Sequence, residues 1–500
     1  MTTALVLTRA RLWAPDSVDP PLVDVAIDSG RITSVVPTTP GRSAGADHID
    51  LGGRWLMPGL VDHHVHFTLW AQHRNRLDVS HAMSATHAAA VVRDALATEA
   101  ADAVGDTTPL VGRGFQDALW PDLPTADLLD RAAAAAGTPH RAVVLISHDL
   151  HSVWINTAAA KRLGVTAGLL REDAAFAVEI AVGGWAAESP EAVARSVDRA
   201  VAAANVRGVT GIMDLEMADN PAVWAARFAR GVRSLRVRAG VYPQHLEGSV
   251  ARGERTGTRL HGTGGLISVG PLKLFADGAL NTRTAWCFDP YPHTEDYGHS
   301  AHARGDLVRL VADARHLGFD VALHAIGDRA VSEALDAFES TGARGTIEHA
   351  QLVREADIKR FAQLGVGAGI HPEHALDDRD VADAMWAGRT DRAFAYGALA
   401  RAGVRLYMGS DAPVAPLDPW RSIAAAVFRT RDDAAPWEPN NALTIEQALR
   451  ASWAMGLVQE GGLADLIAVD DDPRDLDARA LRALPVALTV VAGAVVHHAL

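Results

Sequence analysis

The chain has few of the residues that mark secreted or fibrous proteins. It contains one cysteine, Cys287, in 500 residues, which excludes an intrachain disulfide and agrees with a reducing compartment. Aromatic residues make up 6% of the chain and charged residues 22%, whereas hydrophobic residues reach 48%. This composition is typical of a globular protein with a sizeable core, and we expect a cytoplasmic location.

A long apolar run is also lacking. The most apolar stretch, residues 484–496, is interrupted by Pro485 and Gly493 and is shorter than the roughly 20 residues of a membrane-spanning helix. Residues 1–9 lack the apolar core and the cleavage site of a secretory signal, and are typical of a strand. The sequence therefore predicts no membrane partner.

Basic residues are outnumbered by acidic ones. The chain has 47 Lys and Arg against 61 Asp and Glu, a net charge of −14, and no basic stripe stands out. Because affinity for nucleic acids comes largely from clustered Lys and Arg, we expect no nucleic-acid partner. The expected partner is a small-molecule substrate, and the sequence leaves a homo-oligomer open.

The two ends of the chain share a pattern that differs from the middle. A chain of 500 residues exceeds the usual size of a single core. Residues 1–54 and 462–500 alternate short β-branched runs with turn signals such as residues 28–30. We therefore predict that both ends form one composite β-sandwich domain, separate from residues 55–461.

In the middle of the chain, apolar runs that end in polar residues alternate with Ala-rich, helix-like segments. This alternation predicts parallel strands, and polar residues at strand C-termini are typical of a TIM-barrel active site. We predict an α/β fold with a TIM-type (β/α)8 barrel over residues 55–461. The second clear barrel strand comes far later than one βα unit of about 30 residues allows, which predicts an insertion after the first strand, roughly residues 68–190, that covers the site. The runs are residues 209–214, 237–242, 321–324, 346–349 and 406–411.

The first candidate metal motif is the His-x-His pair that ends residues 57–66. Alternate residues of a strand share a face, so Asp62, His64 and His66 can point into the barrel while His63 points away. With 22 histidines in the chain, about one such pair is expected by chance. Its position at a strand end, behind a Pro-Gly turn, favours a metal site.

Lys273 lies in the apolar, strand-like residues 270–278. An ammonium group has only hydrogen-bond donors and cannot bind a cation. A lysine among metal ligands must therefore be neutral or converted by CO2 to a carbamate, whose two oxygens can serve two metals. The alternative is a surface lysine whose stem packs on apolar neighbours.

Three later strand-end residues complete the candidate set: His324, His349 and Asp411. Each has an ordinary alternative, because the histidines can be hydrogen-bonded residues of a core and Asp411 can cap a helix. Successive candidates from Lys273 through His324 and His349 to Asp411 are 51, 25 and 62 residues apart, close to one or two βα units of about 30 residues or somewhat more. Residues 366–370 supply a strand candidate in the longest gap. The set therefore maps onto one ring of strand ends.

Residues 371–374, His-Pro-Glu-His, also have the spacing of a metal motif. No partner ligand is evident for them in the sequence. We interpret both histidines as surface residues.

Six motifs occur in one order along nearly the whole chain. They are Pro-Gly-Leu-Val-Asp-x-His-x-His at 58–66, His-Ser-Val-Trp-Ile-Asn-Thr-Ala at 151–158, Lys-Leu-Phe-Ala-Asp-Gly at 273–278, His-Ala-Ile-Gly-Asp at 324–328, Glu-His-Ala at 348–350 and Gly-Ser-Asp-Ala-Pro at 409–413. In this order they resemble the amidohydrolase superfamily, most closely its amidohydrolase-3 branch, which includes N-substituted formamide deformylases.

The resemblance implies two divalent metal ions. Imidazole and carboxylate-type oxygens suit zinc, our first choice, and also manganese, iron or cobalt. A hydroxide between the ions would attack a substrate carbonyl that the more exposed ion polarises. Asp411 would shuttle the proton from it to the departing amine. The implied ligands are His64, His66 and Asp411 for the buried ion, His324 and His349 for the second, and carbamylated Lys273 for both.

Substrate contacts are expected from the family-like motif in the insertion and from the segment after Lys273. Two of these residues have structural alternatives, because Trp154 can pack in a core and Arg283 can form an ion pair. The candidates are Trp70, His151, Trp154, Asn156, Asp277 and Arg283.

The leading hypothesis is a metal-dependent hydrolase that cleaves a C–N bond of a small amide, an N-formyl compound or a cyclic amide. One alternative is a mononuclear aminohydrolase that deaminates a heterocycle without a lysine ligand. Another is a catalytically silent barrel that serves as a scaffold or interaction protein, since fold does not fix function.

Overall fold

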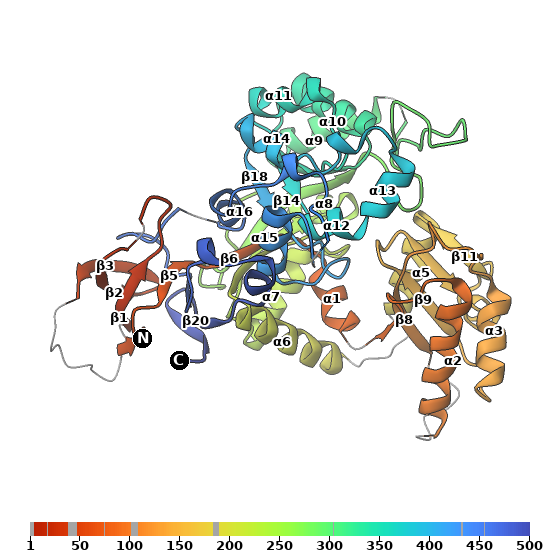
Figure 1. Cartoon of the computed structure of the whole chain (residues 1–500), viewed down its shortest axis with the longest axis horizontal. Coiled ribbons are helices and arrows are strands. Elements are labelled where there is room, and N and C mark those ends of the chain that lie inside the picture. The colour runs from red at the N-terminus through yellow and green to blue at the C-terminus, as the bar shows by residue number, and fades with distance from the viewer. Residues whose placement is uncertain are drawn as a thin grey trace.

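Three β-sheets organise the chain in the computed structural model, which describes residues 5–17, 19–38, 48–74, 76–101, 109–183, 190–303, 305–431, 434–454 and 456–500. Figure 1 shows a central barrel that lies between a sheet built from both ends of the chain and a smaller α/β unit. This arrangement confirms the predicted fold class, a TIM-type barrel with a composite terminal β domain and an insertion.

The composite sheet joins the two ends of the chain around a core that contains Leu7, Val25 and Leu466. It includes residues 55–58, which the sequence assigned to the barrel, because these residues pair with the C-terminal part of the chain before a turn at Gly59. The strand order is β21 (Ala494–His498), β20 (Val486–Val491), β19 (Leu466–Val469), β5 (Trp55–Pro58), β1 (Leu5–Leu12), β2 (Leu22–Asp28) and β3 (Arg31–Pro37), with β4 (His48–Asp50) paired to β1.

The barrel sheet has eight parallel strands, as predicted for alternating strands and helices. Each of the five apolar runs named above contains or overlaps one of its strands. In chain order the strands are β6 (Leu60–Val65), β12 (Val209–Asp214), β13 (Arg236–Val241), β14 (Ile267–Phe275), β15 (Val321–Ala325), β16 (Gly345–His349), β17 (Gly367–Ile370) and β18 (Leu406–Met408).

The barrel closes through residues that follow β18. The amide of Asp411 donates to the carbonyl of His64 at 2.7 Å, and the amide of His66 donates to the carbonyl of Ala412 at 2.8 Å. Gly409 permits this approach, since a Cβ at that position would lie 2.6 Å from the Cβ of His64. The first and last strands thereby bring the His-x-His pair beside Asp411.

Helices cover the outside of the barrel, and polar side chains define where several of them begin. Thr444 and Gln447 form a capping box at the start of one helix, which satisfies amides that lack intrahelical partners. The helices are α1 (Phe67–His73), α6 (Pro190–Val206), α7 (Asn220–Arg230), α8 (Pro243–Ala251), α9 (Asp306–His316), α10 (Asp328–Thr341), α11 (Glu355–Leu364), α12 (Pro372–Asp377), α13 (Arg379–Met385), α14 (Tyr396–Arg401), α15 (Pro419–Phe428), α16 (Ile445–Ala451) and α17 (Ala478–Ala483).

The insertion forms its own five-stranded sheet between α1 and α6. Its first described strand begins after α1, because Phe67 and Trp70 of that helix pack into the core of the barrel. The sheet order is β11 (Gly168–Arg171), β10 (Ser152–Ile155), β9 (Val143–Ser147), β8 (Leu110–Phe115) and β7 (Leu77–Asp78), with α2 (Ala85–Ala101), α3 (Ala126–Ala135), α4 (Thr157–Leu163) and α5 (Asp173–Gly183).

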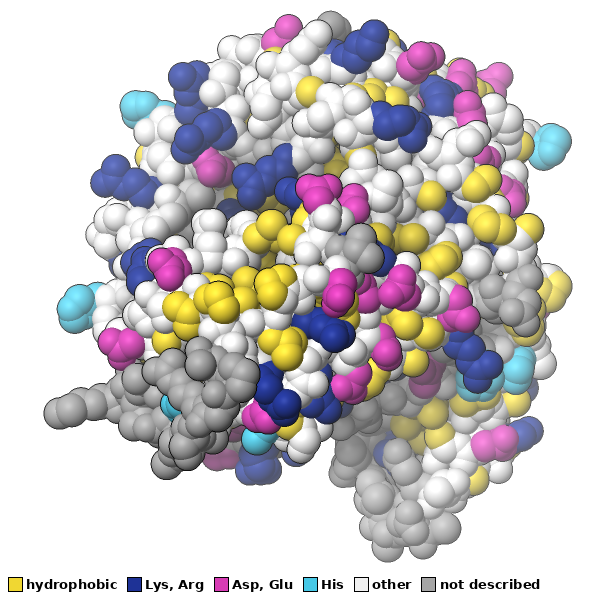
Figure 2. Space-filling model, turned by 60° about the vertical axis from the view of Figure 1, so that its left-hand side comes forward, with side chains coloured by type: hydrophobic (Ala, Val, Ile, Leu, Met, Phe, Trp, Pro, Cys, Tyr) yellow, Lys and Arg dark blue, Asp and Glu magenta, His cyan; other side chains and the backbone are white. Residues whose placement is uncertain are grey.

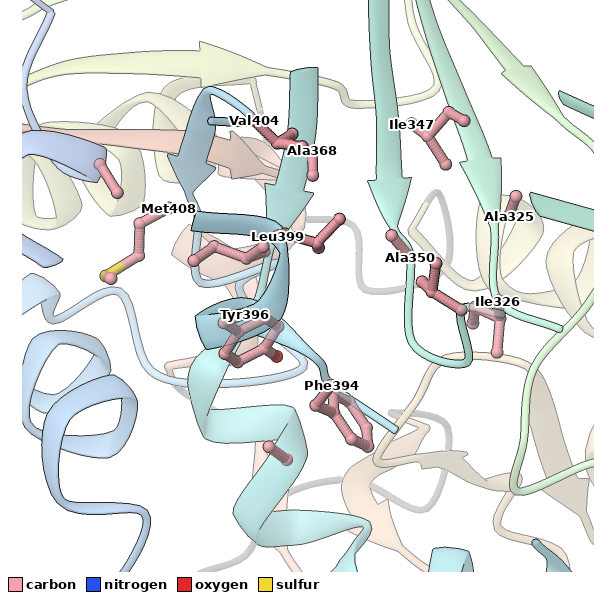
Figure 3. Packing of buried hydrophobic residues seen from close by; sticks show 14 of the residues in the cluster. Ala325, Ile326, Ile347, Ala350, Ala368, Phe394, Tyr396, Leu399, Val404 and Met408 are labelled. Atoms are coloured by element: carbon pink, nitrogen blue, oxygen red, sulfur yellow. The ribbon is translucent and has the colours of Figure 1, made fainter. Parts of the chain in front are cut away.

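Alternation along the barrel strands separates the core from the site. Ala325, Ile347 and Ala368 lie in the apolar cluster that Figure 3 shows around α14. His324 directly precedes Ala325, and Glu348 directly follows Ile347. These two residues are register partners, and because neighbouring residues of a strand point to opposite faces, their side chains point into the barrel. The same strands therefore supply apolar packing outside and polar groups inside.

In Figure 2, acidic and basic side chains are interspersed over the face of the molecule that is shown. Among the described residues, no helix combines the length and apolar character that crossing a membrane requires.

Candidate metal centre

The six residues predicted as metal ligands come together at the C-terminal end of the barrel. They lie on or directly after four strands and at the closure of the barrel, because parallel strands end at one rim. All six line one cavity of about 360 Å³. They are His64, His66, Lys273, His324, His349 and Asp411.

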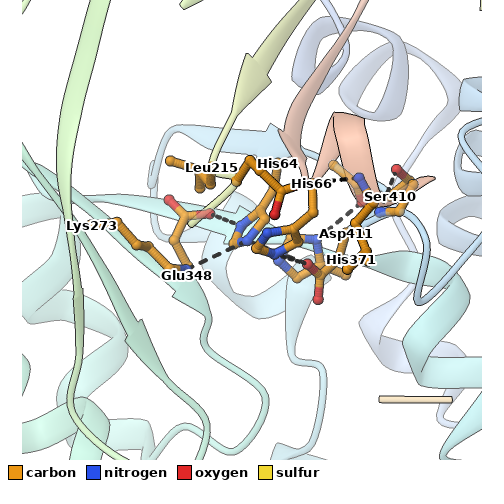
Figure 4. A network of polar contacts seen from close by, with 12 residues as sticks. His64, His66, Leu215, Lys273, Glu348, His371, Ser410 and Asp411 are labelled. Atoms are coloured by element: carbon orange, nitrogen blue, oxygen red, sulfur yellow. Dashed lines mark hydrogen bonds and ion pairs between the residues drawn. The ribbon is translucent and has the colours of Figure 1, made fainter. Parts of the chain in front are cut away.

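His64 occupies the centre of this cluster. Its Nδ1 lies 2.8 Å from Oε2 of Glu348, and its Nε2 lies 3.4 Å from Oδ1 of Asp411 and 3.5 Å from Nζ of Lys273. Figure 4 shows Glu348 and Lys273 on one side of the imidazole and Asp411 on the other. A carboxylate on Nδ1 holds the proton there and leaves the Nε2 lone pair for a metal.

The Glu348 carboxylate occupies space that a side chain on the neighbouring strand would fill. Gly369 is its register partner on β17, and a Cβ there would lie 2.1 Å from the Glu348 Oε2 atom. Glycine at this position therefore keeps space for the carboxylate that orients His64.

Asp411 lies between several imidazoles. Its Oδ1 is 3.3 Å from Nε2 of His66, and its Oδ2 is 3.8 Å from Nε2 of His374. Burial alone would raise the pKa of Asp411, but His64 and His66 hold it well below its usual range. The group therefore stays a carboxylate at neutral pH.

The backbone at two of these residues is in the left-handed region, which non-glycine residues rarely adopt. His349 has φ 71° and Asp411 has φ 56°. Such conformations cost about 1–3 kcal/mol and persist where the surrounding structure enforces them, often at functional sites. Both residues turn away from the strand direction where their side chains meet the cluster.

Three groups of side chains have ligand atoms within 4.8 Å of one another among the described residues. Two of them combine histidines from different strand ends, and two of them share Asp411. The groups are His64, His66 and Asp411; His349, His374 and Asp411; and His64, His349 and His371.

The donor atoms fit a divalent cation. Nδ1 of His349, Nε2 of His371 and Nε2 of His374 are buried and have no hydrogen-bond partner among the described residues. Burial lowers the pKa of each of these imidazoles, that of His371 to about 3, so their lone pairs are free at neutral pH. A buried nitrogen without a partner is costly, and a metal ion would satisfy it.

The interpretation of His371 and His374 as surface residues is wrong. Their exposed fractions are 2% and 5%. His371 directly follows β17, and His374 lies in the first turn of α12. The strand-end pattern that selected the other ligands would have found His371, since residues 366–370 were already predicted as a strand.

His324 lies beside the cluster but belongs to none of the three groups. Its ring centroid is 4.4 Å from that of His349, whereas its Nε2 is 2.9 Å from the carbonyl oxygen of Gly278. Burial lowers its pKa to about 3. The predicted ligand role of His324 stays a prediction.

Lys273 is not a surface lysine, because only 1% of it is exposed. Burial lowers its pKa to about 8, although Glu348 and Asp411 oppose that shift. A larger fraction of this amine is therefore neutral than in an ordinary lysine, and the neutral amine is the form that can react with CO2.

Asp62 and His63 support the motif without joining the ligand groups. The Asp62 carboxylate accepts hydrogen bonds from the amides of His64 and Ser410 at 3.1 and 3.0 Å. His63 points away from the cluster, as predicted, and its ring packs against that of Tyr407.

Among the predicted substrate contacts, only His151 lines the cavity at the cluster. It follows β9, and its Nδ1 lies 2.8 Å from Oε2 of Glu172. Asp277 instead accepts hydrogen bonds from the amides of Ile326 and Gly327 at 3.0 and 2.8 Å. It therefore shapes the loop behind His324.

The other four candidates lie away from that cavity. Trp154 is fully buried in the insertion, where its Nε1 donates to the carbonyl of Thr125 at 2.9 Å. Asn156 caps α4, Trp70 packs in the barrel core, and Arg283 is exposed. Their predicted roles in substrate binding have no contact here that favours them.

The cavity also contains charged residues that the sequence did not single out. Glu179 of α5, Glu216 and Arg227 line it together with Tyr242. Burial raises the pKa of Glu179 to about 7. Glu216 follows the predicted strand 209–214, so the strand-end pattern could have found it, whereas Glu179 lies in a helix that gives no such signal.

A (β/α)8 barrel with histidines, a lysine and an aspartate at its strand ends is the arrangement expected of a metal-dependent hydrolase. The chain belongs to the amidohydrolase family, whose model (Amidohydro_3) matches residues 47–497. It is accordingly an enzyme of the class that hydrolyses carbon–nitrogen bonds other than peptide bonds.

Similar proteins span nearly the whole chain. A Bacillus subtilis protein named as an amidohydrolase, YtcJ, is 28% identical over 91% of this chain and 91% of its own length. The N-substituted formamide deformylase of Arthrobacter pascens is 25% identical over 98% of this chain and 97% of its own. The crystal structure of an uncharacterized metal-dependent hydrolase from Pyrococcus horikoshii has the same fold, with a TM-score of 0.75, 24% identity, and coverage of 95% of this chain and 99% of that one.

Proposed function

We propose that the chain hydrolyses the C–N bond of a small amide, an N-formyl compound or a cyclic amide. The observation that supports this most is the Asp411 carboxylate, which faces the cavity and belongs to two groups of side chains whose spacing could hold a metal ion. The similarity to an enzyme named as a formamide deformylase over almost the full length favours this substrate class.

The proposed cofactors are two divalent ions, with zinc the first choice because most donors are imidazole nitrogens. Bound there, such ions would lower the pKa of water and polarise a substrate carbonyl. His64 and His66 would hold one ion with Asp411. A carbamate on Lys273 would add two oxygens to the centre, for which the buried, partly neutral amine is suited.

Asp411 is the proposed proton shuttle. Its low pKa keeps it ionised, and it lies at the cavity wall, where a carboxylate can accept the proton of attacking water and deliver it to the departing amine. Because an amine leaves slowly as an anion, this delivery is what makes the C–N bond break.

The cavity sets the size and character of the substrate. At about 360 Å³ it suits a small organic molecule. Its wall combines a few charged groups near the ligands with apolar side chains from the barrel and the insertion, which favours a substrate with an apolar substituent beside the amide. The apolar side chains include Leu69, Leu150, Phe176, Ile180, Met217 and Val223.

A single-ion aminohydrolase that deaminates a heterocycle is the second candidate. The group of His64, His66 and Asp411 can hold one ion by itself, which supports this alternative. The buried Lys273 beside that group favours the two-ion centre instead. The scaffold alternative gains no support, since the family and the unpartnered nitrogens both indicate an enzyme.

We also infer from composition that the enzyme acts in the cytoplasm on a free small molecule, without nucleic-acid or membrane partners. The net charge of −14 and the single cysteine support this. An oligomer of identical chains is compatible with it.

The test combines metal analysis with an activity screen. Protein produced with zinc and bicarbonate would be assayed for metal content by elemental mass spectrometry and for amine release from formamides, linear amides and cyclic amides. We expect about two ions per chain and release from at least one of these classes. Ammonia release from heterocycles by protein with one ion would favour the aminohydrolase, and protein that binds no ion would contradict both.

A further inference from the structure

Glu179 reaches the cavity from the insertion and not from a strand end of the barrel. It lies on α5, where Phe176 and Ile180, three residues before it and one after it, also line the cavity. Residues three and four apart share one face of a helix, so this face of α5 forms part of the cavity wall. Only 6% of Glu179 is exposed. A buried carboxyl group therefore faces the space in which a substrate would lie.

The Glu179 carboxyl group lacks the partners that a buried charge requires. Its Oε1 is buried and has no hydrogen-bond partner among the described residues. Nε2 of His73 lies 3.7 Å from Oε1, which is longer than a hydrogen bond, and that nitrogen also has no partner among the described residues. Burial lowers the pKa of His73 well below its usual range. The imidazole is therefore neutral and does not balance a carboxylate.

A second carboxylate makes this part of the cavity more negative. Glu216 follows β12, and its oxygens accept hydrogen bonds from the amides of Leu69 and Met217 at 2.9 and 3.2 Å, which hold it in place. Burial raises the pKa of Glu179 to about 7; Glu216 adds to that shift and Arg76 opposes it. A bound cation would lower the pKa of Glu179 again and offset the cost of burying its charge.

Arg227 is the basic residue on the same wall, and its charge is balanced differently. Its Nη2 donates to Oγ1 of Thr68 at 2.7 Å, and its guanidinium lies over the ring of Trp224. The carboxylates of Asp214 and Glu216 act on it most strongly. Its Nη1 has no partner among the described residues, which makes an anion the alternative ligand of this wall. A cation is favoured because Arg227 has nearby carboxylates, whereas the imidazole beside Glu179 is neutral.

We propose that Glu179 binds a cationic group of the substrate, an ammonium or amidinium at the end of the apolar substituent on the amide. The proposal rests on the hydrolase function proposed above and narrows its substrates to amides that carry a second, basic nitrogen. Leu69, Met217 and Val223 line the same cavity and suit the hydrocarbon between the scissile amide and the cation. Glu179 is thus a specificity-determining residue that the insertion supplies.

The first test measures binding without turnover. Zinc-loaded full-length wild type and Glu179→Gln would be titrated calorimetrically with benzylammonium chloride and with benzyl alcohol, which is similar in size but uncharged. Contacts of either probe with zinc are shared by both proteins and cancel in the comparison. Asp198→Asn, an exposed acidic residue of α6, controls for the loss of one charge. Circular dichroism and thermal unfolding would verify that each variant folds.

We expect benzylammonium to bind the wild type and Asp198→Asn at least about tenfold more tightly than Glu179→Gln, because a hydrogen bond between two charged groups is lost. The affinity for benzyl alcohol should change little. Equal affinities of Glu179→Gln and the wild type for benzylammonium would overturn the proposal.

The second test measures specificity in turnover. Three amides of one chain length, of the class that the wild type hydrolyses, would end in an ammonium, a methyl or a carboxylate group. The ammonium amide should have the highest kcat/KM and lose at least about tenfold in Glu179→Gln, whereas the methyl amide should change little. An equal loss for all three would indicate a structural role and overturn the proposal.

Two further outcomes separate this proposal from its alternatives. The highest kcat/KM for the carboxylate amide would assign this wall to Arg227 and an anion, and would overturn the role of Glu179. A protein that hydrolyses no amide would overturn the proposed function, while the calorimetric comparison would still decide whether Glu179 binds a cation.

Discussion

The sequence predicted which residues line the cavity more successfully for the barrel than for the insertion. All six metal-ligand candidates come from the barrel and line the cavity. Of the three candidates in the insertion, His151 reaches the cavity, whereas Trp154 and Asn156 are structural residues within the insertion. Strand ends in a parallel barrel meet at one rim whatever the intervening loops do, but a motif in a separate unit faces the site only if that unit packs in the required orientation.

The largest expected effect is a loss of turnover when Asp411, which lies where the barrel closes, is replaced. Asp411→Asn should lower kcat by about 10²–10⁴, because an amide cannot accept and return a proton. Turnover would be measured on an amide that the wild type hydrolyses. Asp198→Asn, on the exposed face of α6, is the control for the loss of one charge. Near-normal turnover of Asp411→Asn would show that Asp411 is not part of the mechanism.

Lys273→Ala tests the buried lysine. The loss of the carbamate should lower metal content and activity together, with activity falling at least about 100-fold if two-ion chemistry is required. Lys359→Ala, an exposed lysine on α11, is the matched control. Retention of two ions and full activity in Lys273→Ala would show that the lysine is not part of the centre.

Gly369→Ala tests whether Glu348 orients the predicted metal ligand His64. The new Cβ would displace the Glu348 carboxylate and release His64, which should weaken zinc binding by about 10–100-fold. Chelator competition measures this loss. Gly365→Ala, where a Cβ meets nothing within 4 Å but φ is 66°, controls for backbone strain, and equal affinities in both variants would contradict the role of Glu348.

One pair of variants would separate structure from function within the insertion. Trp154→Ala should reduce stability by about 3–5 kcal/mol, because it leaves a large cavity, with little change in the kcat of the folded enzyme. His151→Ala should do the reverse and alter KM or kcat, since His151 lines the cavity. Thermal unfolding and steady-state kinetics check both, and a direct effect of Trp154→Ala on KM would restore its predicted role in binding.

The smallest expected effect concerns pH. Burial favours the neutral imidazole of His151, but the Glu172 carboxylate raises its pKa to about 9. Since the unfolded pKa is about 6.5, the stabilisation is fully present below that pH and is lost as pH rises toward 9. Glu172→Gln should remove this dependence on pH. The change in Tm between pH 6.5 and pH 9.5 should then differ between the variant and the wild type by about 1–3 °C. Equal shifts in both proteins would show that the pair does not stabilise the fold.

The residues that the sequence missed share a physical reason. His374 looked isolated because its partners, His349 and Asp411, lie at the ends of other strands and become neighbours only when the barrel closes. Glu179 lies in α5 of the insertion, and no periodic pattern indicates that its helix packs over the barrel mouth. Long-range contacts of this kind depend on how separate units pack, which a local pattern does not encode.

The sequence by itself determined the alternation of strands and helices, the composite domain built from both ends, and the ring of polar residues at strand ends. These features follow from period, turn residues and parallel pairing, which are local. The tertiary structure decided which nitrogens of the histidines lack partners, which residues Asp411 faces with each oxygen, and which parts of the insertion reach the cavity. Those properties depend on side-chain orientation and burial, and these exist only once the barrel has closed and its neighbours have packed.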